Sequence, residues 1–294
     1  MMISLCIPTN GICEWVFPCL DSIYQQNINE NKFEVIVTDN GNNKEFQDRM
    51  ESYCRLHSNI VYSKTNAYMF DNQLEALKLA KGDYIKFVNH RAIWMPGRLR
   101  DMLAFLEKYE KEKPVIYFSN GVMGWGPRFE EYGSFDEFVK NLGIYATWTT
   151  GVGIWKEDYD KIPHDLVYDK ISPHSSILFS DRGKNKYIIN DKYWMQEIEN
   201  DHRKKGKYDL YKAFSLDEFI ITINLYRDGD ISIETLKTVK KSFEQFLIEL
   251  YCDFNLFNKP CSYDLDGFDK YVDIFFDKEE ILKKAKQRFR KLKQ

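Results

Sequence analysis

Short, mainly apolar runs alternate with longer segments of helical periodicity over the first 90 residues. The apolar runs predict buried strands at residues 3–7, 33–38, 60–63 and 84–88. Apolar residues that recur every three or four positions predict helices at residues 13–26, 44–56 and 71–81. Strands and helices that alternate at this rhythm form right-handed βαβ units. The pattern therefore predicts an α/β fold with a mostly parallel sheet flanked by helices.

The alternation continues less regularly beyond residue 91 and then gives way to helices alone. The patterns predict helices at 97–110 and 135–142, strands at 115–118 and 149–155, a helix that stops near Pro163, and a last strand at 186–189. Long helical patterns follow at 215–226, 231–252, 265–276 and 278–293. The charged run 197–207 separates the two regions. We therefore predict two domains, an α/β domain over residues 1–200 and a helical C-terminal region over 201–294.

Composition narrows the class of protein. The chain has 294 residues and a formal net charge of −3, which gives no reason to expect a nucleic-acid partner. Its six cysteines are dispersed, without CxxC pairs or zinc-ligand spacing, and this is typical of free thiols in a reducing compartment. The first residues lack the features of a signal peptide, and no apolar run is long enough to span a membrane. We expect a cytoplasmic protein that is soluble or peripheral on the membrane.

Polar residues follow three of the predicted strands. They form the segments Pro8-Thr9-Asn10, Asp39-Asn40-Gly41 and Asn89-His90-Arg91. In open α/β sheets, ligands bind just beyond the carboxyl ends of the strands, so we expect the functional site here. Asp39 could accept a hydrogen bond from a nucleobase N–H, or it could simply form the Asp-Asn-Gly turn. Asn66 and Asn72 could contact ribose or sugar, although Asn72 could instead cap the helix that follows it.

Four ordered signatures give the chain its resemblance to a known family. They are Ser4-Leu5-Cys6-Ile7-Pro8-Thr9-Asn10, Phe33 to Gly41, Asn66 and Asn72 with the following helix to Gly82-Asp83-Tyr84-Ile85, and Thr150-Gly151. Together they resemble the family 2 inverting glycosyltransferases of the GT-A (Rossmann-like) fold, in particular those that build bacterial surface polysaccharides. The resemblance implies a nucleotide-sugar donor, a saccharide or lipid-linked acceptor, and a nucleotide-sugar site. The residues that it assigns to this site are Pro8, Thr9, Asn10, Asp39, Asn66, Asn72, Asn89, His90 and Arg91.

The chain departs from that family at the metal motif. The family generally holds a divalent metal such as Mn²⁺ or Mg²⁺ with Asp-x-Asp, where this chain has Asn89-His90-Arg91. Asn and Arg are poor or impossible metal ligands, whereas a guanidinium suits phosphate oxygens. We predict no metal ligands and hypothesise that Arg91, helped by His90 or Arg98, replaces the metal. The alternative is a surface Arg91 that pairs with Asp101.

A second departure concerns the general base. The family commonly uses a carboxylate at the start of the helix after the Thr-Gly strand, and the corresponding segment here is 168–176. An inverting enzyme needs a group there that takes the proton of the acceptor hydroxyl. His174 is the first candidate and Asp169 the second, while a purely structural His174 is the alternative.

The C-terminal segment 278–293 predicts a basic amphipathic helix. Such a helix could lie on an anionic membrane surface, near a lipid-linked acceptor, or it could pack on its own domain as an ordinary terminal helix.

Together these features predict an enzyme that transfers a sugar, with inversion, from a nucleotide sugar to a growing surface glycan such as a capsule or lipopolysaccharide. Two alternatives stay open. One is a nucleotidyltransferase, although residues 8–11 lack the Gly-rich, Lys-containing loop that such an enzyme would have. The other is a catalytically degenerate GT-A domain that serves as a binding or scaffold subunit.

Overall fold

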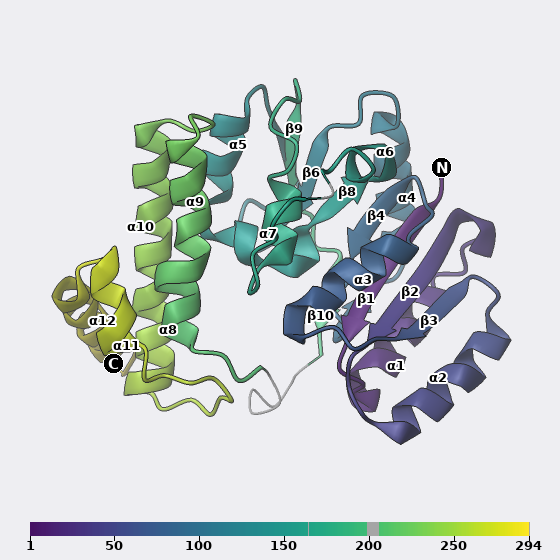
Figure 1. Cartoon of the computed structure of the whole chain (residues 1–294), viewed down its shortest axis with the longest axis horizontal. Helices are drawn as coiled ribbons and strands as arrows, with labels where there is room; N and C mark the ends of the chain where they lie inside the picture. Colours follow the sequence, from purple (N-terminus) through teal and green to yellow (C-terminus); the bar gives the residue numbers. More distant parts are fainter. Residues whose placement is uncertain (164, 199–205, 294) are drawn as a thin grey trace. The chain divides into compact units, whose positions relative to one another are not determined.

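The computed structural model describes residues 1–163, 165–198 and 206–293 (Figure 1). The chain forms two compact units. The first unit combines Met1–Ser134 with Tyr145–Ile198, and the second combines Phe135–Ile144 with the described residues from 206 onward. The limits of 1–200 and 201–294 remain predictions of domain organisation, since the helix at 135–142 groups with the C-terminal residues.

The main sheet of the first unit has the strand order β3-β2-β1-β4-β8. Its strands are β1 (Ile3–Thr9), β2 (Phe33–Asp39), β3 (Ile60–Lys64), β4 (Tyr84–Phe87) and β8 (Gly153–Trp155). The first four are parallel and β8 is antiparallel to β4. The connecting helices are α1 (Cys13–Tyr24), α2 (Lys44–Leu56) and α3 (Asn72–Leu79). The predicted mostly parallel sheet is confirmed.

Burial explains why these strands form where the apolar runs lie. Every residue of β2 is buried, as is every residue of β1 except Pro8, because helices cover both faces of the sheet. The register pairs Ile3 with Phe33 and Thr9 with Asp39, so both strands end at the same level. This alignment sets the polar residues at the two strand ends beside each other.

Two smaller sheets complete the first unit. One has the order β6-β9-β7, and the other pairs β5 with β10. Their strands are β5 (Ala92–Trp94), β6 (Val115–Phe118), β7 (Phe129–Tyr132), β9 (Tyr187–Asn190) and β10 (Met195–Glu197). The helices of this part are α4 (Arg98–Tyr109), α6 (Lys156–Tyr159) and α7 (Pro173–Leu178).

Several predictions about this region were wrong. The strand at 186–189 is not the last one, because β10 follows it, and β5 and β7 were not predicted. The segment 149–155 is a 3₁₀ turn at Thr149–Gly151 followed by the shorter β8. Close packing explains the two glycines of this segment. A Cβ on Gly151 would lie 2.0 Å from the Tyr117 ring, and one on Gly153 would lie 2.5 Å from the Tyr84 hydroxyl.

The second unit is helical, as predicted. Its helices are α5 (Phe135–Leu142), α8 (Leu210–Lys212), α9 (Glu218–Arg227), α10 (Ile233–Leu250), α11 (Phe268–Tyr271) and α12 (Lys278–Lys293), with π-helical turns at Ala213–Asp217 and Tyr251–Leu256. The predicted helix at 265–276 is only α11 followed by a 3₁₀ turn at Val272–Ile274. An aromatic core forms where the Phe219 ring packs on Phe243 at 5.5 Å and on Phe276 at 5.1 Å. Among the described residues, no helix has the length and apolar character needed to cross a membrane.

Candidate functional site

Three strand ends meet at the carboxyl edge of the main sheet. Thr9 ends β1 opposite Asp39 at the end of β2. The Val88 N–H donates to the Cys6 carbonyl at 2.8 Å, so residue 89 emerges just past the neighbouring strand. A hydrogen bond of 2.8 Å then joins Thr9 Oγ1 to His90 Nδ1. The polar segments that sequence reasoning singled out therefore form one cluster.

Asp39 is fully buried at the bottom of this cluster. Its Oδ1 accepts the Gly41 N–H at 2.7 Å, and its Oδ2 accepts the Tyr62 hydroxyl at 3.0 Å. The turn-forming role considered for Asp39 is thus present. A Cβ on Gly41 would lie 1.9 Å from the Asn10 carbonyl oxygen, so glycine lets the Asn10 loop approach the Asp39 turn.

The Asn72 side chain links the ends of β1 and β2 by hydrogen bonds. Its Nδ2 donates to the Thr9 carbonyl at 3.1 Å and to the Thr38 carbonyl at 2.8 Å, and its Oδ1 accepts the Thr65 hydroxyl at 2.8 Å. The residue is 2% exposed, and its side chain does not cap α3. The structure therefore gives Asn72 a positioning role, and direct contact with a ligand stays a prediction. Asn10 and Asn66, by contrast, are exposed at the cluster's rim, and Pro8 is partly buried.

His90 is held in one orientation inside the cluster. Its ring packs edge-on against Trp15 at 5.0 Å, and burial together with the nearby Arg91 charge lowers its pKa to about 3. The ring is therefore neutral at physiological pH. The Thr9 hydroxyl accepts the Gly11 N–H at 3.1 Å and can donate to Nδ1 in the tautomer that carries the imidazole proton on Nε2. His90 can thus act as a neutral donor.

Arg91 lies beside His90 with a side chain that is 15% exposed. Its Nε is 3.6 Å from Glu197 Oε2, and its guanidinium carbon is 5.9 Å from the Trp15 ring centre. Nε is buried without a hydrogen-bond partner among the described residues. The alternative in which Arg91 pairs with Asp101 was wrong, because Asp101 instead binds Arg98 Nη1 at 2.8 Å. Asn89 shapes this turn, since its Oδ1 accepts the Arg91 N–H at 3.2 Å.

The donor atoms of this segment do not fit a divalent metal. Divalent Mn and Mg prefer carboxylate oxygens, and none is contributed by residues 89–91. Within residues 1–163, 165–198 and 206–293, no three His, Cys, Asp or Glu side chains are grouped as metal ligands. The chemistry available here is therefore that of a guanidinium and a neutral imidazole.

His174, the first candidate for the base, is buried in α7 and only 3% exposed. Its Nε2 donates to the Thr147 carbonyl at 2.9 Å. Its Nδ1 lies 3.3 Å from Thr149 Oγ1 and 3.2 Å from the Gln73 side chain. Burial lowers the pKa of His174 to about 4. Because both ring nitrogens are used inside the protein, the geometry argues against His174 as a base.

Asp169, the second candidate, is partly buried in the turn before α7. Its Oδ1 accepts the N–H groups of Ile171 and Ser172, each at 2.8 Å. Its Oδ2 has no hydrogen bond to any other residue that the structure describes. One oxygen is therefore anchored by the backbone while the other remains available to take a proton.

Lys86 is a residue whose role sequence reasoning missed. It is fully buried in β4, and its Nζ donates to the carbonyls of Phe87 at 2.9 Å, Val152 at 3.2 Å and Thr150. Burial lowers the pKa of Lys86 to about 7. The only signal was a lysine inside the otherwise apolar run of β4. Through these hydrogen bonds Lys86 links β4, the strand that leads to residues 89–91, to the 3₁₀ turn at Thr149–Gly151.

Comparison with known proteins agrees with this geometry. Residues 4–165 match the family model described as glycosyl transferase family 2. The chain belongs to glycosyltransferase family 2. No curated protein sequence matches it.

Solved structures show which fold this family 2 chain has. It is similar to residues 1–349 of TarS from S. aureus, with a TM-score of 0.57 at 16% identity, over 92% of this chain and 75% of that one. The complex of the same protein with UDP-GlcNAc gives 0.56 at 16% identity, over 99% and 90%. Full-length TarS matches with 0.56 at 15% identity, and this chain covers 54% of its length. At such identities the likeness shows the GT-A fold, which confirms the predicted fold class.

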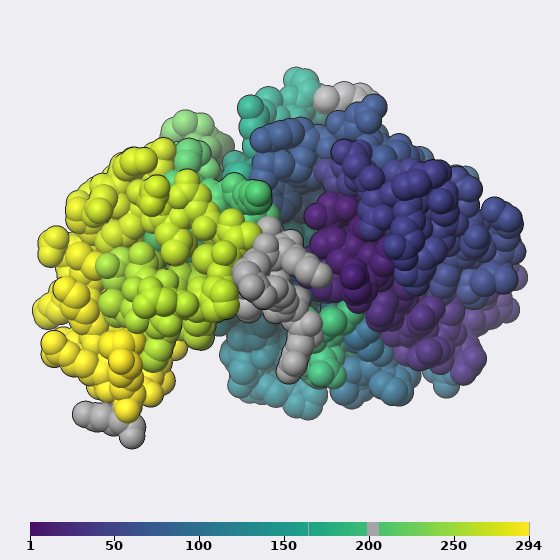
Figure 2. All heavy atoms as spheres, turned by 90° about the horizontal axis from the view of Figure 1, so that it is seen from below, coloured from purple at the N-terminus to yellow at the C-terminus, as the bar shows by residue number. Residues whose placement is uncertain are grey.

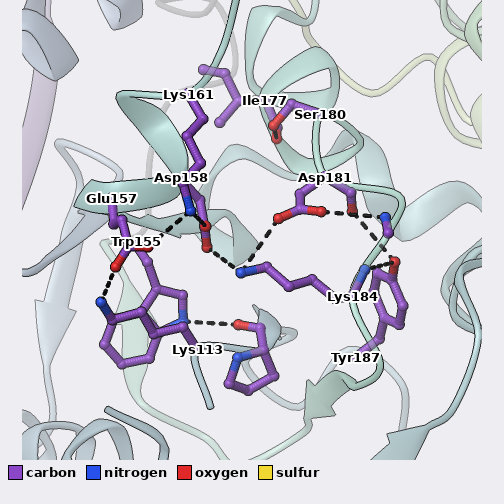
Figure 3. Close-up of polar contacts among 12 residues, drawn as sticks. Lys113, Trp155, Glu157, Asp158, Lys161, Ile177, Ser180, Asp181, Lys184 and Tyr187 are labelled. Carbon is purple, nitrogen blue, oxygen red and sulfur yellow. Dashed lines mark hydrogen bonds and ion pairs between the residues drawn. The ribbon is translucent and has the colours of Figure 1, made fainter. Parts of the chain in front are cut away.

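Asp158, Asp181 and Lys184 form a separate ion-pair cluster of this family 2 domain (Figure 3). Asp158 follows β8, whose last residue, Trp155, pairs with Tyr84 at the start of β4. Lys184 Nζ is 2.7 Å from Asp158 Oδ2 and 3.4 Å from Asp181 Oδ2. The neighbouring cavity of about 10 Å³ has room for roughly one water molecule, not a sugar. This cluster joins α6 to the segment before β9 and has a structural role.

The buried His174 and the partly buried His90 should make stability depend on pH. Their pKa values of about 3 for His90 and about 4 for His174 lie below the ordinary 6.5. Below pH 6.5 the unfolded chain therefore binds protons that the folded chain does not, and the free energy of unfolding falls as the pH is lowered. At pH 5 we expect a loss of about 2 kcal/mol from His174 and less from the partly exposed His90. Urea unfolding at pH 7.5 and 5 measures this, and His174→Gln should reduce the difference. Equal stability at both pH values would contradict it.

Proposed function

We propose that this chain transfers a sugar from a nucleoside-diphosphate sugar to a saccharide acceptor with inversion of the anomeric carbon. The observation that carries the proposal is the hydrogen-bonded cluster at the carboxyl edge, in which Thr9, Asp39 and His90 converge inside the segment 4–165 that matches the family. In an open α/β sheet this edge is the usual ligand site.

The nucleoside end of the donor binds at the exposed residues around Asp39, whose buried carboxylate orders the adjoining turn. Asn10 and Asn66 at the rim offer amide groups to the base or ribose. The similarity to TarS, which has been solved with UDP and with UDP-GlcNAc, makes a uridine nucleotide the first choice of ligand.

The phosphate end binds at His90 and Arg91. When the bond between the anomeric carbon and the phosphate oxygen breaks, the leaving diphosphate gains negative charge. The Arg91 guanidinium stabilises that charge, and the His90 Nε2–H donates a hydrogen bond to it. Asp169 Oδ2 takes the proton of the acceptor hydroxyl as its oxygen bonds to the anomeric carbon from the opposite face.

A thermal-shift panel tests the proposed activity class. UDP-, GDP-, CDP- and dTDP-sugars are each added with EDTA or with Mn²⁺, and one nucleotide class should raise the Tm because it binds the native state. About 100 times Kd of ligand stabilises by about 2.7 kcal/mol. No shift with any nucleotide would favour the scaffold alternative. The four nucleoside triphosphates are added in parallel wells, and stabilisation by these alone would favour the nucleotidyltransferase.

Synthesis of a bacterial surface glycan is the pathway we propose, with a capsule or lipopolysaccharide chain as the acceptor. It rests on the resemblance of the sequence motifs. A lipid-linked acceptor would bring the protein to the cytoplasmic face of a membrane.

Exposed Lys and Arg side chains of the C-terminal helix α12 favour contact with the anionic surface of such a membrane. Its apolar residues Ile281 and Ala285 are fully buried, and the Phe289 ring packs on Phe257 at 4.6 Å, so α12 packs on its own unit. Among its exposed cations, Lys286, Arg290 and Lys291 form no ion pair with any described residue, and Lys293 Nζ lies 4.4 Å from the centre of the Phe289 ring. Figure 2 shows the C-terminal segment, in yellow, open at the surface.

We therefore expect the intact protein to bind anionic vesicles without insertion of an apolar face. Vesicles with 30% phosphatidylglycerol should sediment the protein at low salt, whereas pure phosphatidylcholine should not, since each cation near an anionic surface contributes about 1 kcal/mol. The triple variant Lys286→Gln, Arg290→Gln, Lys291→Gln should lose binding. Neutralising Arg100, Lys108 and Lys111, which are also exposed, is the matched control. Binding that survives the α12 triple variant would end the proposal.

A further inference from the structure

A glycine-rich loop, residues 119–128, lies between β6 and β7. Its backbone turns three times through glycines with positive φ: Gly121 at +82°, Gly124 at +71° and Gly126 at +80°. Such angles favour glycine because it has no Cβ. A Cβ on Gly124 or Gly126 would meet nothing within 4 Å, so the backbone path, and not crowding, requires glycine there. The sequence therefore specifies the shape of this loop.

Asp191 is buried under the loop and accepts hydrogen bonds from it. It is 1% exposed at the end of β9, and its carboxylate accepts the Ser119 hydroxyl, the Met123 N–H at 3.1 Å and the Trp125 N–H at 2.8 Å. A buried carboxylate is costly unless donors surround it, and here all three donors come from the loop. The loop is consequently anchored to Asp191 by three hydrogen bonds, although its tip is exposed.

Asn120 connects the base of the loop to the strand beside Arg91. Its Oδ1 accepts the N–H groups of Trp194 and Met195, and its Nδ2 donates to the Met195 carbonyl at 2.8 Å. Three residues after Met195, just past the end of β10, the Ile198 N–H donates to the Arg91 carbonyl at 2.8 Å. Three residues of extended chain span about 10 Å. The loop base therefore lies about 10 Å from the backbone of the proposed phosphate site.

The loop also lies at the same end of the unit as that site. Near the start of β4, Trp155 Nε1 donates to the carbonyl of Pro114, just before β6, at 2.9 Å. Near the end of β4, Lys86 Nζ is 5.5 Å from the ring of Phe118, the last residue of β6. The two strands therefore run in the same direction, and the loop leaves β6 at the carboxyl edge.

The exposed part of the loop has side chains suited to a sugar ring. Trp125 is partly exposed, and the Arg128 guanidinium carbon lies 5.7 Å from its ring centre. Tyr193, whose ring is 3.3 Å from the Cβ position of Gly121, is 46% exposed. An indole offers an apolar face to the C–H face of a pyranose, and a guanidinium offers donors to its hydroxyls.

We propose that the 119–128 loop binds the acceptor saccharide, with Trp125 stacked on a pyranose ring and Arg128 donating to its hydroxyls. Asp191 is the positioning residue that presents Trp125. This inference rests on the proposed sugar transfer and deepens it, because it assigns the acceptor to a loop at the same carboxyl edge as the proposed phosphate site.

Saturation-transfer NMR with simple pyranosides tests the assignment. The probes are methyl β-D-glucopyranoside and methyl N-acetyl-β-D-glucosaminide, each added to the intact protein with saturating UDP. Ring protons of at least one probe should receive saturation from the wild-type protein, and Trp125→Ala should weaken that binding at least fivefold. Phe129→Ala is the control, since Phe129 is also 46% exposed but packs on Phe105 of α4 at 5.3 Å.

UDP binding separates failure of this inference from failure of the proposed function. If UDP raises the Tm of the wild type and of Trp125→Ala equally, the donor site is intact, and the pyranoside result then judges the loop alone. No transfer to either pyranoside, or equal transfer in Trp125→Ala, would overturn the inference. Absence of any effect from UDP or from the other nucleotides of the thermal-shift panel would instead count against the proposed function.

Discussion

Replacing Asp169 by Asn should lower kcat for sugar transfer by about 10²–10⁴-fold while the Kd for the nucleotide stays unchanged. This is the range that a positioned general base contributes. Asparagine keeps an oxygen that can accept the Ile171 and Ser172 N–H groups, so the turn before α7 should survive. What it removes is the basic Oδ2. Single-turnover kinetics with the donor chosen by thermal shift measure the effect, and Asp165→Asn, on an exposed neighbour, is the matched control.

His174→Gln should behave differently from Asp169→Asn. Its ring is bonded to Thr147 and lies beside Thr149 and Gln73, so its replacement should lower the Tm and leave kcat within about tenfold. If His174→Gln were the inactive variant and Asp169→Asn were active, the proposed assignment of the base would be reversed.

The first half of the α/β unit could be predicted because its strands are buried on both faces. A strand such as β2 then reads as a nearly continuous apolar run, and the helix α2 was predicted with the bounds that it has. The strands β5 and β10 were missed because three residues are too few to show a period of two. The strand β7 was missed because half of its residues are acidic.

The location of the candidate site was easier to predict than the roles within it. Parallel strands carry their carboxyl ends to one edge, so Thr9, Asp39 and His90 could be brought together from the sequence alone. The sequence does not show in the same way which polar side chains are buried. Nothing in the sequence distinguishes a histidine turned inward, as His174 is, from one that faces a ligand. Asn72 likewise looked like a ligand contact or a cap, and its bonds to two strand ends depend on the assembled sheet.

The missing metal motif makes Arg91 the other decisive residue. Arg91→Ala should lower kcat/KM by about 10²–10³-fold, the effect of removing one preorganised donor from developing charge, and EDTA should leave the wild-type rate unchanged. Arg91→Lys should recover only part of the rate, because an ammonium cannot bind two phosphate oxygens as a guanidinium does. Initial rates over a range of donor concentrations measure all three.

Two controls separate charge stabilisation by Arg91 from a structural role. If Arg91 served only to hold Glu197, which lies 3.6 Å away, then Glu197→Gln would cause the same loss; we expect it to change the rate less than threefold. Arg98→Ala tests the neighbouring guanidinium, which is bound to Asp101 and should matter little. A wild-type rate abolished by EDTA and restored by Mn²⁺ would show that a metal neutralises the diphosphate after all. The pair Asn89 and His90 would then have to be reconsidered as ligands, because Arg91 itself has no lone pair to offer.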